Sequence, residues 1–384
     1  MPYAWGSRSA IAELTGRATP SAEPEAELWM GAHPMAPSRL VRGGAPVSLA
    51  EAIAKEPERE LGAEVAKKFG PRLPFLLKIL AAAEPLSIQA HPSMAQARAG
   101  FDDEENKGIA RNAGHRNYKD ASHKPELLCA LTPFDALCGF RAIDETLALF
   151  DRLGVRALDD KLAPLRATRD QKGLAETFRL VMTTPEHERA ALVDAVVAAC
   201  DKTGSDDARE RAWAVRLAAL YPGDVGVVSA LLLNLIHLEP GDAVYLGAGN
   251  LHAYLEGTGV EIMASSDNVL RGGLTKKHVD VPELMKVLDF VAGPVAPLRP
   301  KAIDEVERVY ETPAAEFRLS VIDLASRAGG VTRTLLGPEI LLAVSGSASI
   351  GETKFGRGQA VFVPACLGKY TLDGDAVVYR ATVG

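Results

Sequence analysis

Residues 241–252 read GDAVYLGAGNLH, and residues 358–369 read GQAVFVPACLGK. Each copy has a turn glycine, a predicted five-residue strand and a second turn. A repeated glycine turn, strand and turn is typical of all-β double sheets that close around a ligand, so we predict two jelly-roll barrels. The alternative is two unrelated hairpins, because short glycine turns are common in antiparallel sheets.

The first copy resembles the cupin half-motif G-x5-P-x-G-x2-H, with Gly247 in place of its proline. His252 occupies the histidine position of that motif, whereas Lys369 occupies it in the second copy. Histidine is a common metal ligand and an ammonium group is not. We therefore predict one barrel with a metal site and one without.

The spacing of apolar, charged and turn residues divides the chain into three parts. Ala, Leu, Arg, Glu and Asp recur at helical spacing over 143–220, which predicts a helical insertion at 141–223. Short apolar runs between turns surround it, so we expect a mostly β chain with a catalytic cupin-like barrel built from 1–140 and 224–290. A second barrel would span 291–384. Residues 48–69 also read as helical.

Composition excludes several classes of protein. The 384 residues carry a net charge of −7, which disfavours a broad nucleic-acid surface. The first twenty residues lack an apolar signal region, and no stretch is long enough to span a bilayer. We expect a cytoplasmic monomer that binds neither nucleic acid nor membrane. Four cysteines without C-x-x-C spacing are expected to be reduced and mostly buried: Cys129, Cys138, Cys200 and Cys366.

Four residues in three distant segments could hold one divalent cation. Strand alternation over 86–91 places Gln89 and His91 on the same face as Ser87. Glu126 follows in H-K-P-E, and His252 ends the first repeat copy. An amide oxygen, a carboxylate and two imidazoles suit Zn²⁺, with Fe²⁺, Mn²⁺ or Co²⁺ as alternatives. We predict one metal ion per chain.

Other polar residues share the same predicted faces. Lys124 has a two-residue relation to Glu126, and Tyr254 has the same relation to His252. Arg271 follows the polar segment Ser-Asp-Asn at 266–268. A guanidinium group can donate two hydrogen bonds to a phosphate or to an oxygen that gains negative charge.

These residues resemble the zinc-dependent, cupin-type mannose-6-phosphate isomerases. YKDASHKPE at 118–126, the stretch from His252 through Arg271, and short segments around Trp5 and Trp29 carry the resemblance. It implies interconversion of mannose 6-phosphate and fructose 6-phosphate, with Gln89, His91, Glu126 and His252 as zinc ligands. It also implies further active-site residues: Lys78, Ser87, His123, Lys124, Tyr254, Glu261, Asp267, Arg271 and Lys277. The resemblance gives His33 no ligand role, and we expect it in a hydrogen-bonded pocket wall.

Aldose–ketose isomerisation moves a proton between C1 and C2 through an enediol, and a metal can stabilise the charge on the adjacent oxygen. Lys124, His123 and Asp267 are the candidates for the base, and the sequence does not choose among them. Arg271 is expected to stabilise the enediolate or to help open the ring. Lys78 and Ser87 are the predicted phosphate contacts.

Two features separate the chain from the usual family pattern. Arg-Gly-Gly at 271–273 and Thr-Lys-Lys at 275–277 replace Arg-Ala-Gly and Thr-Pro-Lys in the predicted mouth of the barrel. Loss of that proline loosens the mouth. Two rival functions are an Fe²⁺ dioxygenase and a sugar-phosphate-binding protein without catalysis.

Overall fold

The computed structural model describes residues 1–202, 206–326 and 329–384. Helices and strands contribute similar shares of these residues, so the prediction of a mostly β chain underestimated the helices. The reason is that short helices also flank the strands outside the segment predicted to be helical. No helix within the described ranges has both the length and the apolar character that crossing a bilayer requires.

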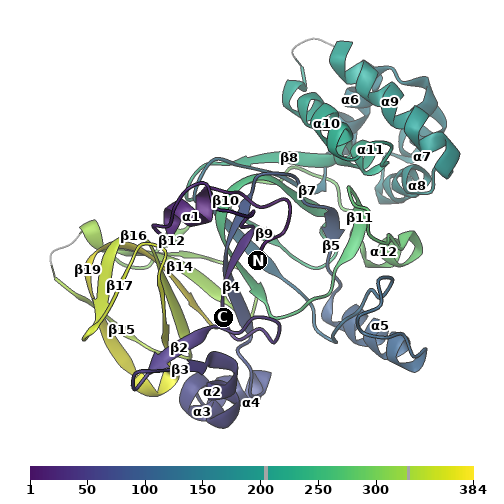
Figure 1. Ribbon diagram of the computed structural model, residues 1–384. Helices are drawn as coiled ribbons and strands as arrows, with labels where there is room; N and C mark the ends of the chain where they lie inside the picture. Colours follow the sequence, from purple (N-terminus) through teal and green to yellow (C-terminus); the bar gives the residue numbers. More distant parts are fainter. Residues whose placement is uncertain (203–205, 327–328) are drawn as a thin grey trace.

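A nine-stranded antiparallel sheet occupies the centre of the molecule (Figure 1). In chain order its strands are β1 (Glu27–Met30), β4 (Phe75–Ala82), β5 (Ile88–Ala90), β6 (Glu126–Ala130), β7 (Phe134–Phe140), β8 (Leu233–Leu238), β9 (Ala243–Leu246), β10 (His252–Ala264) and β11 (Leu270–Gly273). The long strand β10 pairs with β5 and β7 through its first half and with β4 and β6 through its second half. It therefore joins the two halves of the sheet.

Strand β10 changes its inward-facing register midway. Tyr254 in the first half and Glu261 and Met263 in the second half all line one cavity, although even and odd positions of a regular strand face opposite sides. A bulge between Tyr254 and Glu256 supplies the one-residue offset. The alternation predicted for His252 and Tyr254 thus holds only on one side of the bulge.

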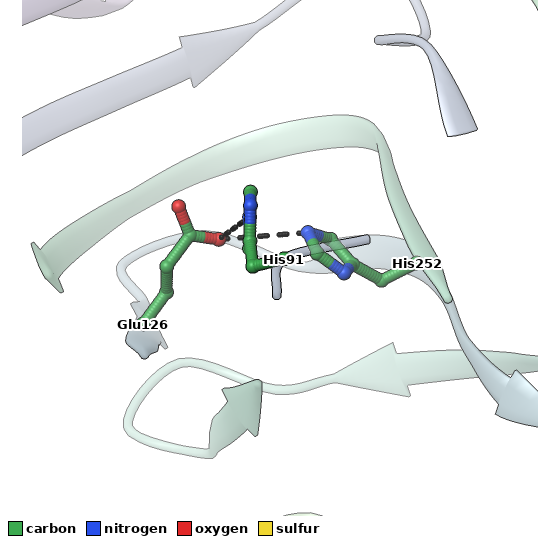
Figure 2. Close-up of side chains that lie close together, drawn as sticks. All are labelled: His91, Glu126 and His252. Carbon is green, nitrogen blue, oxygen red and sulfur yellow. Dashed lines mark ion pairs between the residues drawn. The ribbon is translucent and has the colours of Figure 1, made fainter. Parts of the chain in front are cut away.

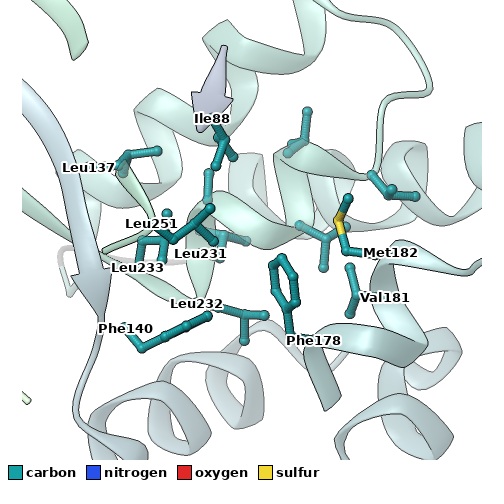
Figure 3. Packing of buried hydrophobic residues seen from close by; sticks show 14 of the residues in the cluster. Ile88, Leu137, Phe140, Phe178, Val181, Met182, Leu231, Leu232, Leu233 and Leu251 are labelled. Atoms are coloured by element: carbon teal, nitrogen blue, oxygen red, sulfur yellow. The ribbon is translucent and has the colours of Figure 1, made fainter. Parts of the chain in front are cut away.

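Helices fill the connection between β7 and β8. They are α6 (Ile143–Leu153), the 3₁₀ turn η1 (Arg156–Leu158), α7 (Asp159–Thr168), α8 (Gln171–Met182), α9 (Glu186–Lys202), α10 (Ala208–Leu220) and α11 (Gly226–Leu231). Their apolar faces pack against the outer side of the central sheet, where Phe178 lies close to Phe140 and the 231–233 leucines (Figure 3). The last of these helices, α11, lies beyond residue 223, the predicted end of the helical segment.

A second, eight-stranded sheet follows the central one. Its strands are β12 (Lys301–Ala302), β13 (Glu307–Tyr310), β14 (Arg318–Asp323), β15 (Val331–Thr334), β16 (Glu339–Ile350), β17 (Thr353–Gly356), β18 (Ala360–Val363) and β19 (Lys369–Thr382), with 3₁₀ turns η2 (Leu324–Ser326) and η3 (Ala365–Leu367). Tyr310, Leu319 and Leu342 from this sheet pack with Leu77 and Ile262 of the central sheet. The two sheets thereby share an apolar core.

The two copies of the sequence repeat form equivalent structures. Gly241 (φ 92°) and Gly358 (φ 77°) make the turns that need a left-handed backbone, which favours glycine. Each is followed by a four-residue strand, β9 or β18. A long strand then begins eleven residues after the glycine, at His252 in β10 and at Lys369 in β19.

The remaining elements lie around both sheets (Figure 1). They are α1 (Ala10–Leu14), the hairpin β2 (Arg39–Arg42) and β3 (Ala45–Ser48), α2 (Leu49–Lys55), α3 (Pro57–Leu61), α4 (Ala63–Phe69), α5 (Met94–Asn106) and α12 (Val281–Val287). Helix α12 lies beside β11, and α3 lies against η3 of the second sheet. The helical segment predicted at 48–69 is three short helices. Ser48 caps the first as expected, but Pro57 starts a new helix and Gly62, with φ 86°, ends it.

Candidate metal centre and cavity

His91, Glu126 and His252 converge inside the central sheet. His91 directly follows β5, Glu126 begins β6 and His252 begins β10. One carboxylate oxygen, Oε2 of Glu126, lies 3.2 Å from Nε2 of His91 and 3.5 Å from Nε2 of His252 (Figure 2). All three side chains are at most 2% exposed. Their ligand atoms lie within 4.8 Å of one another, which is close enough to surround one ion.

The hydrogen bonds around these rings show why a cation fits. Nδ1 of His91 is 2.8 Å from the main-chain oxygen of Asn268, and Nδ1 of His252 is 3.0 Å from that of Asn250. A carbonyl only accepts, so each Nδ1 must donate and each Nε2 of the neutral ring carries a lone pair. Both Nε2 atoms and Glu126 Oε2 are buried without a hydrogen-bond partner. Three electron-pair donors facing one another are satisfied by a shared metal ion.

Charge states in the centre agree with metal ligation. Burial lowers the pKa of His91 to about 4, so the ring is neutral near pH 7. Burial alone would raise the pKa of Glu126, but the nearby Lys124 ammonium holds it well below its usual value. Nζ of Lys124 lies 2.9 Å from the other carboxylate oxygen, Oε1. Neutral imidazoles and an ionised carboxylate are the forms that bind Zn²⁺.

Strand register places two further predicted residues beside this centre. Gln89 of β5 stands opposite His252 of β10, and Arg271 of β11 stands opposite Gln89. Directly opposed residues in antiparallel strands project to the same face of a sheet. His252, Gln89 and Arg271 therefore form one row across three strands, with the amide next to the metal ligands and the arginine one strand further.

A cavity of about 480 Å³ opens beside this row. Sequence-predicted residues contribute much of its lining: Lys78, Ser87, Gln89, Lys124, Glu126, Tyr254, Glu261, Asp267, Arg271 and Lys277. Sequence reasoning missed other polar wall residues, namely Glu27, Lys119, Thr275 and Lys276. Glu27 stands two residues before Trp29, within a segment that resembles the family, and strand alternation could have placed both residues on this wall.

His123 is the candidate base that the structure places elsewhere. It is absent from the cavity lining, and its Nε2 lies 2.7 Å from Oε1 of Glu316, which precedes β14. His123 lies just before β6, next to the inward-facing Lys124, and its side chain points to Glu316 instead of into the cavity. Prediction of His123 as a base therefore finds no geometric support.

Lys78 lies in the cavity wall, but its charge is already neutralised. Its Nζ is 2.8 Å from Oε2 of Glu261 and 3.2 Å from Oε1 of Glu27. Burial would lower the pKa of Lys78, yet these two carboxylates raise it above its usual value. A phosphate at this position would meet both carboxylates, and like charges repel. These ion pairs therefore argue against Lys78 as a phosphate contact.

The mouth of the cavity, by contrast, gathers cations without partners. The exposed Lys119, Lys276 and Lys277 line it next to the half-buried Arg271, and none of the four makes an ion pair with any residue in the described ranges. Burial and the repulsion of Arg271 and Lys119 lower the pKa of Lys277, and burial lowers that of Arg271. Unneutralised cations at a cavity mouth attract anions.

Asp267 lies at the same mouth and is held by His33. Nε2 of His33 is 3.4 Å from Oδ1 of Asp267, and Nδ1 of His33 accepts a hydrogen bond from the main-chain N–H of Met35. His33 thus forms part of the hydrogen-bonded pocket wall predicted for it. Its hydrogen bond lowers the pKa of Asp267, against the effect of burial. Asp267 is an ionised carboxylate near pH 7.

Three buried ligands beneath a cavity with a cationic mouth define a metal-binding enzyme site for an anionic substrate. Residues 1–143 match the family model described as the catalytic domain of type I phosphomannose isomerase. The chain is 38% identical to mannose-6-phosphate isomerase of Escherichia coli (strain K12), with 98% of this chain and 96% of that protein covered. It is 33% identical to the rat enzyme, with 99% and 96% covered. The chain belongs to the mannose-6-phosphate isomerase family.

Solved structures give the same result. Mannose 6-phosphate isomerase from Salmonella typhimurium, bound to substrate (f6p) and zinc, superposes with a TM-score of 0.92 at 36% identity. The match covers 100% of this chain and 97% of that one. A zinc-bound form of mannose 6-phosphate isomerase matches equally well, with a TM-score of 0.92.

Proposed function

We infer that the protein is a zinc-dependent isomerase that interconverts mannose 6-phosphate and fructose 6-phosphate. The observation that carries this conclusion is the convergence of three buried, unpartnered ligand atoms from His91, Glu126 and His252. Gln89 completes the ligand set, because its register places its side chain beside His252. One Zn²⁺ per chain bound there supplies Lewis-acid stabilisation of the oxygen that becomes negative, an effect worth several kcal/mol.

Lys124 is the proposed proton-transfer residue, which as the neutral amine would take the proton from one carbon and return it to the other. The two carbons that exchange the proton carry the oxygens whose charge a bound Zn²⁺ would stabilise, so the group that moves the proton should lie beside the metal ligands. Nζ of Lys124 is 2.9 Å from a ligand carboxylate and reaches the cavity. Asp267 lies at the mouth instead, where its ionised carboxylate can bind a sugar hydroxyl. Tyr254 and Glu261 contribute further polar contacts to the wall.

Arg271 is the proposed electrostatic partner of the enediolate. It stands one strand away from Gln89 in the row of inward-facing residues, and its own charge has no carboxylate partner within the described ranges. A guanidinium group that is not already paired can strengthen its interaction as negative charge develops on the substrate. Ring opening, which the same residue could assist, precedes the proton transfer.

The phosphate is assigned to the mouth. Lys119, Lys276 and Lys277 offer three uncompensated charges together with the hydroxyl of Thr275, whereas Lys78 is paired with two carboxylates. A phosphate there would hold the far end of an open-chain sugar while its first two carbons reach the metal centre. Ser87 also lines the cavity and is left as a contact for a sugar hydroxyl.

The finer architecture follows the same proposal. We assign residues 1–140 and 224–290 to a catalytic cupin-like jelly-roll barrel and 291–384 to a second barrel without metal, joined by a helical insertion at 141–223. The matching repeat strands support this assignment, and Lys369, exposed at the position equivalent to His252, explains the absence of a ligand. Four free cysteines, three of them buried, support a reducing compartment, so we propose a cytoplasmic protein. We also propose that it is a monomer.

One assay tests the proposal. Mannose 6-phosphate is supplied to the purified protein, and fructose 6-phosphate is measured with and without prior chelation. Activity should disappear on chelation, return with stoichiometric Zn²⁺, and be much weaker with mannose, which lacks the phosphate. Binding of the sugar phosphate to the zinc-loaded protein without turnover would support the non-catalytic alternative, and oxygen consumption would support a dioxygenase.

A further inference from the structure

Asn268 lies in the connection between β10 and β11 and is completely buried. Its side chain uses every hydrogen-bonding position that an amide has. Oδ1 accepts from the main-chain N–H groups of Lys119 (2.7 Å) and Asp120 (3.2 Å). Nδ2 donates to the main-chain oxygens of Asp120 (2.7 Å) and Ser122 (2.8 Å). The side chain thus fixes the backbone at residue 268 against the 119–122 segment.

The main chain of the same residue contacts the metal centre. The carbonyl oxygen of Asn268 accepts the hydrogen bond from Nδ1 of His91 at 2.8 Å. This bond directs the Nε2 lone pair of His91 toward Glu126 and fixes the plane of the ring. A shift of the backbone at residue 268 would therefore rotate or displace a metal ligand.

Asp120 holds the two segments together from the other side. Its carboxylate accepts hydrogen bonds from Ser266 Oγ (2.9 Å), from the main-chain N–H of Asp267 (2.8 Å) and from that of Ser122 (2.9 Å). The segments 119–122 and 266–268 are thereby joined around the buried Asn268 by reciprocal bonds in both directions. Satisfied buried networks of this kind are rigid.

The segments joined in this way carry groups with different tasks. The 119–122 segment begins with a cation of the mouth and leads into Lys124 and Glu126, while the 266–268 segment contains Asp267 and leads into Arg271. His91 is attached to the second segment through Asn268. We propose that Asn268, supported by Asp120, is a positioning residue that sets the geometry of the zinc ligand His91 relative to the substrate-binding mouth. This inference rests on the proposed zinc site.

The test compares zinc affinity in two asparagine variants. Asn268→Ala removes the clamp, and Asn234→Ala is the matched control. The half-buried Asn234 also donates to several main-chain carbonyls, including those of Phe140 and Gly293, but it contacts no proposed ligand. Dissociation constants for Zn²⁺ are measured by chelator competition on the holoenzyme, with thermal unfolding of each variant alongside. Asn268→Ala should weaken zinc binding by about 10- to 100-fold, as loss of groups that orient metal ligands does.

The control variant separates loss of the clamp from a general loss of stability. Asn234→Ala should lower stability but leave the zinc dissociation constant within about twofold of wild type, since no ligand depends on it. An unchanged constant in Asn268→Ala, or an equal weakening in both variants, would overturn the inference. If Asn268→Ala does not fold, the isosteric Asp120→Asn decides: it should weaken zinc binding several-fold, and an unchanged constant contradicts the clamp. A wild-type protein without stoichiometric zinc would instead refute the proposed function itself.

Discussion

Lys78→Met tests whether the lysine in the cavity wall is a structural cation or a phosphate ligand. Methionine has a similar length but no charge, so the buried carboxylates of Glu27 and Glu261 would lose their partner. At 2.8 Å and an effective dielectric constant near 20, the contact with Glu261 alone corresponds to about 6 kcal/mol of Coulomb energy. Because breaking a buried ion pair destabilises measured proteins by about 3–5 kcal/mol, we expect a loss of that size.

Urea unfolding followed by circular dichroism, with zinc in excess, measures this loss. The double variant Lys78→Met/Glu261→Gln should recover part of it, since one of the two uncompensated charges is gone. If the single variant unfolds like wild type while its KM for mannose 6-phosphate rises tenfold or more, Lys78 binds phosphate and the reasoning from its ion pairs is wrong.

The same variant has a predictable pH dependence. Burial already raises the pKa of Glu261 in the wild-type protein. Without the Lys78 ammonium, the folded-state pKa of Glu261 should rise further above its unfolded value. A carboxyl group of this kind stabilises the folded state as the pH falls, because the folded protein binds the proton more tightly. The stability difference between Lys78→Met and wild type should therefore shrink between about pH 8 and pH 5; a constant difference would contradict the assignment.

Three further predictions concern turnover. Arg271→Ala should lower kcat by about 100-fold or more while zinc content measured by atomic absorption stays at wild-type level, and an unchanged kcat would remove Arg271 from the reaction. Replacing Lys276 and Lys277 together with alanine should raise KM for the sugar phosphate about tenfold and weaken its salt dependence, whereas alanine at the single lysine of β17 should change neither; equal effects would place the phosphate elsewhere. His33→Ala should raise the pKa of Asp267 by removing its hydrogen bond, so the acidic limb of kcat/KM should move to higher pH; a profile that does not move would show that ionised Asp267 is not required.

The metal centre could be predicted because its residues stand in locally regular strands. Alternation in 86–91 and at the start of β10 depends only on neighbours in sequence, so the inward faces of Gln89 and His252 follow from pattern alone. His123 lies just before β6, outside the regular strand, and its direction depends on Glu316, 193 positions away, which local alternation does not place.

Other features depend on partners far apart in the chain. The neutralisation of Lys78 requires Glu27 on β1 and Glu261 on β10, whose register only the folded sheet defines. The reversal of inward-facing positions in β10 arises from a bulge that no sequence pattern predicted. The clamp around Asn268 likewise joins segments almost 150 residues apart. Such pairings are set by tertiary packing, and local periodicity carries no information about them.

The most direct test of the central claim is a zinc anomalous diffraction experiment on crystals of the active protein. We expect one peak per chain, about 2.0–2.2 Å from Nε2 of His91, Nε2 of His252 and Oε2 of Glu126, with the Gln89 amide oxygen completing the shell. A peak at any other place, or full isomerase activity in crystals and solutions that contain no divalent metal, would contradict it.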